Sequence, residues 1–480
     1  MSRETFESGE TFDAVIVGAG TAGMPCAITA AQHGARVAVV EKTAEVGGSL
    51  HVSAGSMSAA GTRRQRERGI DDDPRLHLDD IIRITRGTAN PALARLAVEE
   101  APHAVDWLDE LGYAFDEATP LIYSGYEPYS RARVYFGQDL ARSIYVVLRP
   151  LWDEHVAAGR IVPFLETSLQ SLLLDEQRVV GVTACRKTGE LTLRSQAVVL
   201  ATGGYGSNPE LFSELTPGSP RLVSATRLSS TGDGLQIARE HGAAVRGTEH
   251  YLGTIGGIEE EPGSGRSDWW AGYANIYPSE RPPAEIHVNG HGVRFVAEDH
   301  PSPDLRQRIQ LEQPDGKLWV VFGAGALKAG EPLVPQWDAA TFRRKAREGR
   351  CAFSASTLRE LAGRAGIDAD GLERTVRAWN EAVRTGVDPL GRREPGPPID
   401  TPPYYALLTH PISLLTFAGL AVDTDLRVLS ESGVPIEGLH AIGEVIGGSA
   451  VTGNAFCTGM MVTPALSFGR IVGRRLTVSV

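Results

Sequence analysis

Cysteine is scarce in this sequence. Four cysteines occur in 480 residues, at positions 26, 185, 351 and 457, and no two of them form a CxxC pair. Their spacing gives no support to a zinc site or to a dithiol redox centre. Scattered cysteines of this kind suit a reducing compartment, so the sequence predicts a cytoplasmic protein without a bound metal.

Positive charge and long apolar runs are lacking as well. The chain has 47 Lys and Arg against 59 Asp and Glu, which gives a net charge of −12 at pH 7. Nucleic-acid binding normally needs clustered Lys and Arg, and the one short basic run, at 63–68, is interrupted by Gln65 and Glu67. No stretch approaches about 18 uninterrupted apolar residues, and the acidic segment 1–13 lacks the apolar centre of a signal peptide. We therefore expect no nucleic-acid partner and no membrane span.

Glycine, by contrast, is in surplus, since it supplies 54 of the 480 residues where roughly 7% is usual. Hydrophobic residues at 42% and charged residues at 22% are typical of a folded chain, so the surplus is not a sign of disorder. At about 150 residues per domain, the length predicts two or three units. The glycines then mark either linkers or places where the backbone must approach something closely.

The order of patterns along the chain predicts an α/β fold. A strand, a helix and a second strand over residues 12–41 form a βαβ unit, and residues 74–115 look helical. After residue 250 aromatics, prolines and glycines dominate, and a long helical pattern returns at 356–385. The predicted division is 1–250 with 413–480 as one discontinuous domain and 251–412 as an inserted domain.

The strongest local signal is a GxGxxG pattern at Gly18, Gly20 and Gly23, which follows the first strand and opens the first helix. The first glycine permits a tight turn, the second lets a pyrophosphate approach the backbone, and the third lets helix and strand pack closely. Glu41 ends the next strand, where a carboxylate can accept hydrogen bonds from ribose hydroxyls. Strand, helix and acid together predict a dinucleotide site.

Five further motifs extend this pattern: Gly47-Gly48-Ser49, Ala54-Gly55-Ser56, Ala201-Thr202-Gly203-Gly204, Thr231-Gly232-Asp233-Gly234 and Gly443-Glu444-Val445. In this order they resemble the fumarate reductase / 3-ketosteroid dehydrogenase superfamily of flavoproteins over nearly the whole chain. The resemblance implies bound FAD, a glutathione-reductase-like Rossmann domain that holds it, and an inserted α+β capping domain. By the same resemblance, the residues that contact FAD are Gly18, Gly20, Thr21, Ala22, Gly23, Glu41, Lys42, Gly47, Gly48, Ser49, Ala54, Gly55, Ser56, Ala201, Thr202, Gly203, Asp233, Gly443, Glu444, Ala465 and Leu466.

A histidine close to the flavin raises the question of covalent attachment, which occurs in the succinate dehydrogenase branch of the superfamily. The resemblance places Leu50 at the linkage position and His51 beside it. We therefore expect FAD to be held without a covalent bond.

The substrate-binding residues of the fumarate reductases are replaced. Leu414 and Leu415 stand where that branch has two histidines, and Ser302 stands at about the place of its arginine proton donor. Its C-terminal arginine is also replaced, within residues 453–459. A dicarboxylate in a pocket without these cations would bury two poorly paired charges, which is costly. The replacements argue against fumarate as the substrate.

The segment 464–469 resembles the ketosteroid dehydrogenase branch more closely. There a glycine N–H polarises the substrate carbonyl, and Gly459 matches that glycine. Removing hydrogen beside a carbonyl also needs a base for the α proton, and Tyr126, Tyr129 and His300 are the candidates. A tyrosine needs its pKa lowered for this role, whereas a histidine titrates near neutrality. Each candidate also has a plain structural interpretation, as a packing tyrosine or a turn histidine.

These observations predict an FAD-dependent dehydrogenase of CH–CH groups, which desaturates a C–C bond next to the carbonyl of a small cyclic or apolar ketone. The alternative is a reductase of an activated C=C bond, and a weaker one is a non-redox FAD-binding protein. Both redox alternatives need an external electron acceptor or donor. Four aromatic residues early in the inserted domain either line an apolar substrate pocket or form domain core: Trp269, Trp270, Tyr273 and Tyr277.

Overall fold

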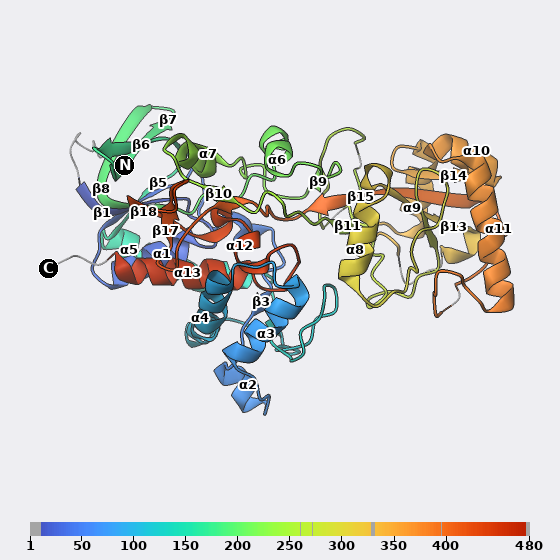
Figure 1. The fold of residues 1–480 in the computed structure, drawn as a ribbon, viewed down its shortest axis with the longest axis horizontal. Coiled ribbons are helices and arrows are strands. Elements are labelled where there is room, and N and C mark those ends of the chain that lie inside the picture. The colour runs from blue at the N-terminus through green and yellow to red at the C-terminus, as the bar shows by residue number, and fades with distance from the viewer. Residues whose placement is uncertain (1–10, 260, 271, 328–331, 395, 477–480) are drawn as a thin grey trace.

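The structure is a computed structural model that describes residues 11–259, 261–270, 272–327, 332–394 and 396–476. Figure 1 shows two units along the long axis of the molecule, with helices α10 (Leu358–Ala365) and α11 (Ala369–Thr385) at the far end of the second unit. Each unit is built on its own sheet. The predicted α/β class is confirmed.

The first unit contains an eight-stranded sheet with the parallel order β18-β8-β1-β2-β5. Strand β17 adds an antiparallel edge, and β6 and β7 form a meander with β8. All four residues of β2 are buried, which is typical of parallel strands covered on both faces. The strands are β1 (Thr11–Val17), β2 (Val37–Val40), β5 (Ile161–Phe164), β6 (Thr167–Asp175), β7 (Arg178–Arg186), β8 (Gly189–Leu200), β17 (Arg427–Leu429) and β18 (Pro435–Ala441).

Helices cover this sheet and extend it. The predicted βαβ unit is present as β1, α1 and β2. The predicted helical region 74–115 consists of two helices, because Arg86 adopts a left-handed conformation after the first and Asn90 caps the start of the second. The helices of this unit are α1 (Gly23–Gln32), α2 (Arg63–Glu67), α3 (Pro74–Thr85), α4 (Pro91–Glu110), α5 (Arg142–Ala157), α6 (Pro209–Leu215), α7 (Asp233–Glu240), α12 (Ser449–Thr452) and α13 (Val462–Arg475).

Close packing of α13 on α1 holds the C-terminal segment against the nucleotide-binding motif (Figure 1). A Cβ added to Gly469 would lie 2.5 Å from the carbonyl oxygen of Ala22, and one added to Gly473 would lie 2.6 Å from that of Cys26. The two helices therefore approach each other through bare backbone on one face of α13.

Replacing Gly473 with alanine should lower the free energy of unfolding by about 1–3 kcal/mol, because the added methyl group forces the helices apart. Gly363→Ala is the matched control, since Gly363 lies within helix α10 and an added Cβ meets nothing within 4 Å. Both changes raise helix propensity by the same amount. The difference between the free energies of unfolding of the two variants, measured in urea, therefore reports the effect of the added methyl group on helix packing. Equal stability of the two variants would contradict the close approach.

The second unit contains a six-stranded sheet around the long strand β15. Strands β13, β11, β14 and β9 each pair with a part of β15. Its strands are β9 (Val223–Ser224), β11 (Thr254–Gly257), β12 (Ile286–Val288), β13 (Leu318–Phe322), β14 (Ala352–Ala355) and β15 (Tyr404–Ser413). Strand β9 precedes residue 251, so the sheet also draws on chain assigned to the first domain; the exact division stays a prediction.

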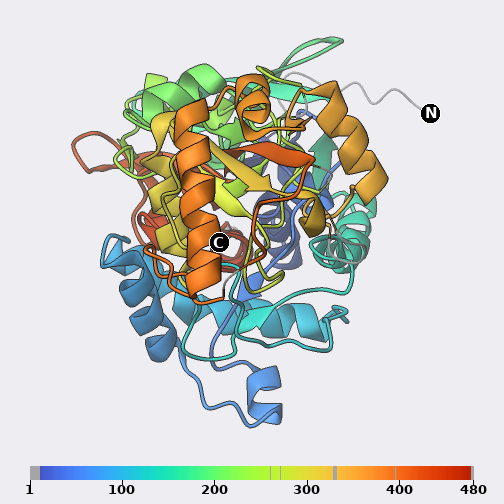
Figure 2. The same ribbon diagram turned by 90° about the vertical axis from the view of Figure 1, so that its right-hand side faces the viewer.

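Helices pack around this second sheet, and α11 crosses its outer end (Figure 2). The predicted helix over 356–385 is two helices, because Gly366 ends the first in a left-handed conformation and Asp368 caps the second. The helices are α8 (Pro303–Leu311), α9 (Ala339–Glu348), α10 (Leu358–Ala365) and α11 (Ala369–Thr385). The remaining short strands pair in twos: β3 (Met57–Ser58) with β4 (Val134–Tyr135), and β10 (Val245–Arg246) with β16 (Gly419–Leu420).

Candidate active site

A cavity of about 370 Å³ lies where the parallel strands of the first sheet end. Val17 ends β1, Glu41 follows β2 and Ala201 follows β8, and all three residues line the cavity. Open α/β sheets bind ligands in this crevice, outside the carboxyl ends of their strands. From there the cavity reaches residues 414–415, just after β15, and 456–459, just before α13.

The turn after β1 presents backbone to the cavity. Gly18 has a φ of +101°, and a Cβ on it would lie 2.3 Å from the carbonyl oxygen of Ala201. A Cβ on Gly23 would lie 1.8 Å from the carbonyl oxygen of Gly18, so α1 starts against the turn. Gly20 is different, because the nearest protein atom to its added Cβ is Cα of Gly48, at 3.8 Å. Gly20 and Gly48 both line the cavity and form a cradle that fits a pyrophosphate.

Glu41 lines the cavity, and neighbouring groups hold its carboxylate in place. The backbone N–H of Ala19 donates to Oε2 at 2.9 Å, and the N–H and Oγ1 of Thr43 donate to Oε1 at 2.9 and 2.8 Å. Beside it, Lys42 forms an ion pair with Asp233, with 2.7 Å between Nζ and Oδ2. A carboxylate fixed at this point is a ready acceptor for ribose hydroxyls.

Two further polar groups of the lining fit a hydroxyl-rich ligand. Thr416 donates to Oε1 of Glu444 through its N–H at 2.8 Å and its Oγ1 at 3.0 Å. Burial raises the pKa of Glu444, although the bonds from Thr416 lower it. The buried Oγ1 of Thr202 has no hydrogen-bond partner among the described residues. A fixed carboxyl and an unsatisfied hydroxyl suit the ribityl chain of FAD.

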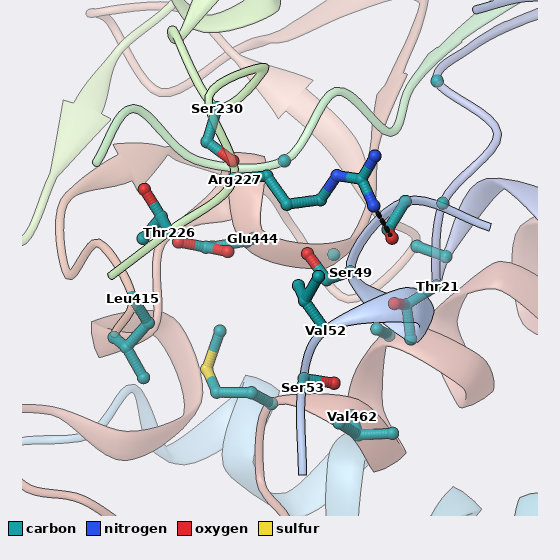
Figure 3. Close-up of a pocket in the computed structure, with 18 of the residues that line it drawn as sticks. Thr21, Ser49, Val52, Ser53, Thr226, Arg227, Ser230, Leu415, Glu444 and Val462 are labelled. Atoms are coloured by element: carbon teal, nitrogen blue, oxygen red, sulfur yellow. Dashed lines mark hydrogen bonds between the residues drawn. The ribbon is translucent and has the colours of Figure 1, made fainter. Parts of the chain in front are cut away.

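Apolar side chains line the cavity together with several serines and threonines, and Figure 3 shows Leu415 and Val462 on the opposite side of the cavity from Arg227. Only Lys42 and Arg227 carry positive charge among the described lining residues, and Nη1 of Arg227 donates to the carbonyl oxygen of Gly48 at 2.8 Å. Both cations therefore already have protein partners. The large apolar side chains of the lining include Tyr123, Tyr126, Phe136, Trp269, Leu414, Leu415, Phe456, Met461 and Val462.

Gly459 lies in a turn pressed against strand β3. Its φ is +82°, and an added Cβ would lie 2.3 Å from the carbonyl carbon of Met57 and from the nitrogen of Ser58. Gly459 lines the cavity, and its N–H has no hydrogen-bond acceptor within the part of the chain that the structure describes. That N–H is the group expected from the sequence to contact a substrate carbonyl.

The structure brings Tyr126 to the cavity but not Tyr129 or His300. The Tyr126 hydroxyl lies 3.5 Å from Oγ1 of Thr254, and burial raises its pKa. The Tyr129 hydroxyl donates to the carbonyl oxygen of Thr458 at 2.7 Å, so this residue braces the turn that carries Gly459. His300 accepts a hydrogen bond at Nδ1 from a backbone N–H two residues further on, which places it in a local turn.

Most of the residues expected to contact FAD line the cavity, and Gly23, Gly47 and Leu466 are the exceptions. Gly23 packs on the turn after β1, a Cβ on Gly47 would meet His51, and Leu466 is fully buried in the core. His51 is itself engaged, since its Nε2 lies 2.8 Å from a backbone oxygen. The sequence did not predict a role for segment 225–230, because this segment contributes lining residues but contains no recognisable motif.

The four aromatic residues of the capping domain divide between the two roles considered for them. Trp269 lines the cavity and stacks on Tyr273, with ring centroids 4.9 Å apart. The indole N–H of Trp270 donates to the carbonyl oxygen of Val52 at 2.8 Å and so joins the two units at the cavity rim. Tyr277 is buried in the core of the capping domain.

Comparison with known proteins shows the family to which the chain belongs. A family model described as FAD binding domain matches residues 13–459. The probable fumarate reductase Ifc3 of Shewanella frigidimarina is 30% identical over 97% of this chain and 74% of its own length. The urocanate reductase of Eggerthella lenta is 30% identical over 96% of this chain and 74% of its own length. The predicted superfamily resemblance and the predicted FAD cofactor are confirmed.

Among solved structures, the 3-ketosteroid Δ1-dehydrogenase of Sterolibacterium denitrificans aligns with a TM-score of 0.78 at 23% identity, over 98% of this chain and the whole of that one. This likeness confirms the predicted fold, a Rossmann-type FAD-binding domain with a capping domain. Within the described residues, no helix has the length and apolarity needed to cross a membrane.

Proposed function

Because the chain belongs to the family of FAD-binding domain proteins and is an FAD-dependent oxidoreductase of C–C or C=C bonds, we propose that it acts on a bond next to the carbonyl of a cyclic or otherwise apolar compound. In the first form of the proposal it desaturates a ketone. The observation that carries the proposal is the group of large apolar side chains in the lining, where the two described cations already have protein partners.

FAD binding is assigned to the polar part of the cavity. The cradle at Gly20 and Gly48 would take the pyrophosphate, Glu41 the adenosine ribose and Glu444 the ribityl chain. When bound, FAD supplies the acceptor or donor of the hydride. We expect FAD to be bound without a covalent link, which the 2.8 Å contact between Nε2 of His51 and a backbone oxygen supports.

The chain's own residues handle the substrate oxygen and the proton. In this proposal the Gly459 N–H, which lines the cavity, donates to the carbonyl oxygen and stabilises the enolate that forms there. Tyr126 presents a buried phenol to the same cavity and is the group we assign to hold the α proton. Phe456 packs on Tyr126, with ring centroids 5.0 Å apart, and keeps water from that side.

A second candidate is the reverse reaction, reduction of an activated C=C bond with electrons from a separate donor. The names of two relatives favour it, since both are called reductases. The site does not distinguish the two directions, because the same carbonyl donor and the same proton-holding group serve both.

Anaerobic mixing of the purified yellow protein with saturated cyclic ketones separates the two candidates. Bleaching of the flavin absorbance by a ketone supports desaturation. Reoxidation of the chemically reduced protein by enones, with no bleaching by any ketone, supports reduction instead. Fumarate is the matched charged probe, and we expect it to react at least about a hundredfold more slowly than an apolar enone. Efficient turnover of fumarate would contradict the apolar-substrate proposal.

A further inference from the structure

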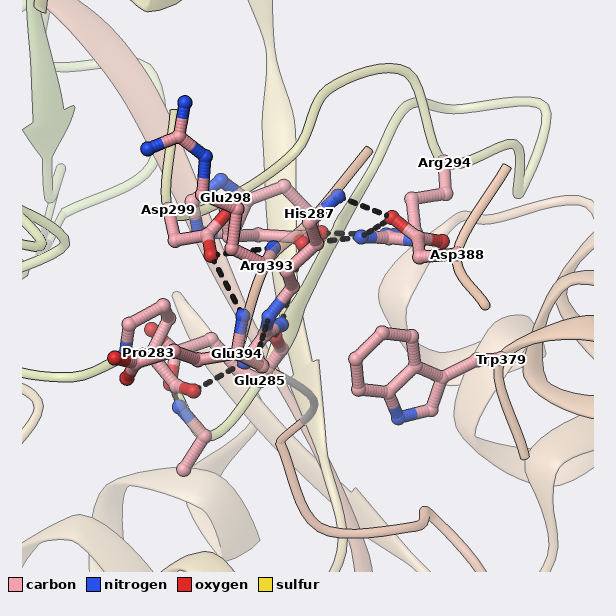
Figure 4. A network of polar contacts seen from close by, with 12 residues as sticks. Pro283, Glu285, His287, Arg294, Glu298, Asp299, Trp379, Asp388, Arg393 and Glu394 are labelled. Atoms are coloured by element: carbon pink, nitrogen blue, oxygen red, sulfur yellow. Dashed lines mark hydrogen bonds and ion pairs between the residues drawn. The ribbon is translucent and has the colours of Figure 1, made fainter. Parts of the chain in front are cut away.

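Arg227, in the cavity lining, forms a long and exposed ion pair among the described residues. Its Nη2 lies 3.9 Å from Glu45, whose side chain is 60% exposed. By contrast, Figure 4 shows Arg294 of the capping domain, whose guanidinium lies 2.6 Å from Glu298 and also contacts Asp388. An exposed ion pair stabilises its charges little, so the positive charge of Arg227 remains available to a ligand of the cavity.

The Arg227 side chain joins two segments of the lining. It comes from the segment after β9, and its Nη1 donates to the carbonyl oxygen of Gly48, in the turn after β2, at 2.8 Å. Figure 3 shows the side chain extended to this carbonyl. Gly48 is also one of the two glycines that form the cradle for a pyrophosphate. The guanidinium is therefore held beside that cradle by a residue 179 positions away in the sequence.

The backbone at Arg227 is fixed as well. Its carbonyl oxygen accepts hydrogen bonds from Oγ of Ser207 at 2.7 Å and from the N–H of Ser230 at 2.9 Å. The carbonyl oxygen of Thr226 accepts one from Nη2 of Arg266 at 2.8 Å. Because its backbone and its guanidinium are both held, Arg227 loses little further conformational freedom when a ligand binds.

The other described cation of the lining has less to offer an anion. Nζ of Lys42 lies 2.7 Å from Oδ2 of Asp233 and donates to Oγ1 of Thr231 at 2.6 Å. A guanidinium has several N–H donors in a planar arrangement that matches phosphate oxygens, and the bond to Gly48 uses one of them. Arg227 is thus the cation with donors to spare beside the cradle.

We propose that Arg227 binds the pyrophosphate of FAD and, because it is also bonded to Gly48, slows release of the cofactor. The bond between Arg227 and Gly48 opens when FAD enters or leaves. The inference rests on the placement of FAD proposed above and is independent of the substrate and of the direction of the reaction. It also assigns this cation of the lining to the cofactor and not to a substrate carboxylate.

The test compares release of FAD from the loaded proteins Arg227→Met and Arg227→Lys and from the control Arg246→Met. Arg246 is exposed and does not line the cavity. Flavin fluorescence after dilution reports release, and circular dichroism confirms the fold. We expect FAD to leave Arg227→Met at least about tenfold faster than the control, as for the loss of a charge-assisted hydrogen bond. Arg227→Lys should be intermediate, because it keeps the charge but loses the planar group.

The ionic-strength dependence tests the role of charge. Added salt should weaken FAD binding to the unaltered protein more than to Arg227→Met, since the variant has no guanidinium for salt to screen. An identical salt dependence in the two proteins would contradict an electrostatic contact between Arg227 and the pyrophosphate.

Riboflavin, which lacks phosphate, separates phosphate binding from the shape of the cavity. It should bind the apoproteins of the unaltered chain and of Arg227→Met equally, whereas FAD should bind the variant at least about tenfold more weakly. Equal release of FAD from Arg227→Met and the control would overturn the inference. An equal loss of affinity for FAD and riboflavin would overturn it too, because Arg227 would then only shape the turn at Gly48. If FAD binds but neither ketones nor enones react, the proposed reaction fails, while the release rates still decide the role of Arg227.

Discussion

Replacing Gly20 with valine should give a folded protein that no longer binds FAD. The nearest protein atom to a Cβ at this position is 3.8 Å away, an ordinary contact, so the protein itself accommodates the side chain's first atom. The branched side chain would instead occupy the cradle that Gly20 forms with Gly48 at the cavity. We expect FAD affinity to fall by at least about a hundredfold, or ~2.7 kcal/mol.

The measurement is titration of the apoprotein with FAD, followed by flavin fluorescence, together with circular dichroism to confirm the fold. Gly325→Val is the matched control, because an added Cβ there meets nothing within 4 Å and Gly325 does not line the cavity. It should purify yellow with unchanged affinity. If the Gly20 variant binds FAD as tightly as the control, the pyrophosphate does not pass along this cradle.

Gly18 offers a contrast on the same turn. A Cβ on it would lie 2.3 Å from a backbone oxygen of Ala201, and its φ of +101° is strained for any other residue. Substitution there disturbs the packing of β1 against the segment after β8, so loss of FAD would accompany loss of fold. Only Gly20 separates the two effects.

The nucleotide end of the site could be predicted because its geometry is local. A strand, a tight turn and a helix N-terminus follow one another within a dozen residues, and the turn needs Gly18 and Gly20 whatever else the fold contains. The same holds for Glu41, which follows directly after a strand of that unit. These local motifs predicted a dinucleotide site, and the superfamily resemblance of the further motifs implied that the dinucleotide is FAD.

The substrate end could be predicted only in part, because side chains there meet across long sequence separations. Tyr126 and Tyr129 lie three residues apart, yet one reaches the cavity and the other turns to Thr458. Their loop has no periodicity that tells the two apart.

The second large expected effect concerns Arg133, which holds the loop that carries Tyr126. Replacing Arg133 with methionine should lower the free energy of unfolding by about 3–5 kcal/mol, because the fully buried Asp72 loses its cation and the buried Asp80 keeps only the half-exposed Arg83, whose Nη2 lies 2.7 Å from it. Nη2 of Arg133 lies 2.8 Å from Asp72 and Nη1 lies 3.2 Å from Asp80, and Arg133 and Asp72 have fully buried side chains. Asp80 also accepts hydrogen bonds from the N–H and Oγ of Ser130, both at 2.7 Å. The ion cluster therefore ties the loop that carries Tyr126 to helix α3.

Urea-induced unfolding measures the loss, and Arg131→Met is the matched control, since Arg131 is exposed in the same loop. The control should stay within about 0.5 kcal/mol of the unaltered protein. Because the loop is tied through Asp80, the Arg133 variant should also lose activity before it unfolds, as Tyr126 moves away from Phe456. An Arg133 variant that is as stable as the control would mean that the two carboxylates are protonated or solvated without the guanidinium. In that case the cluster would not be what positions the loop, and the placement of Tyr126 would have to come from its aromatic contacts alone.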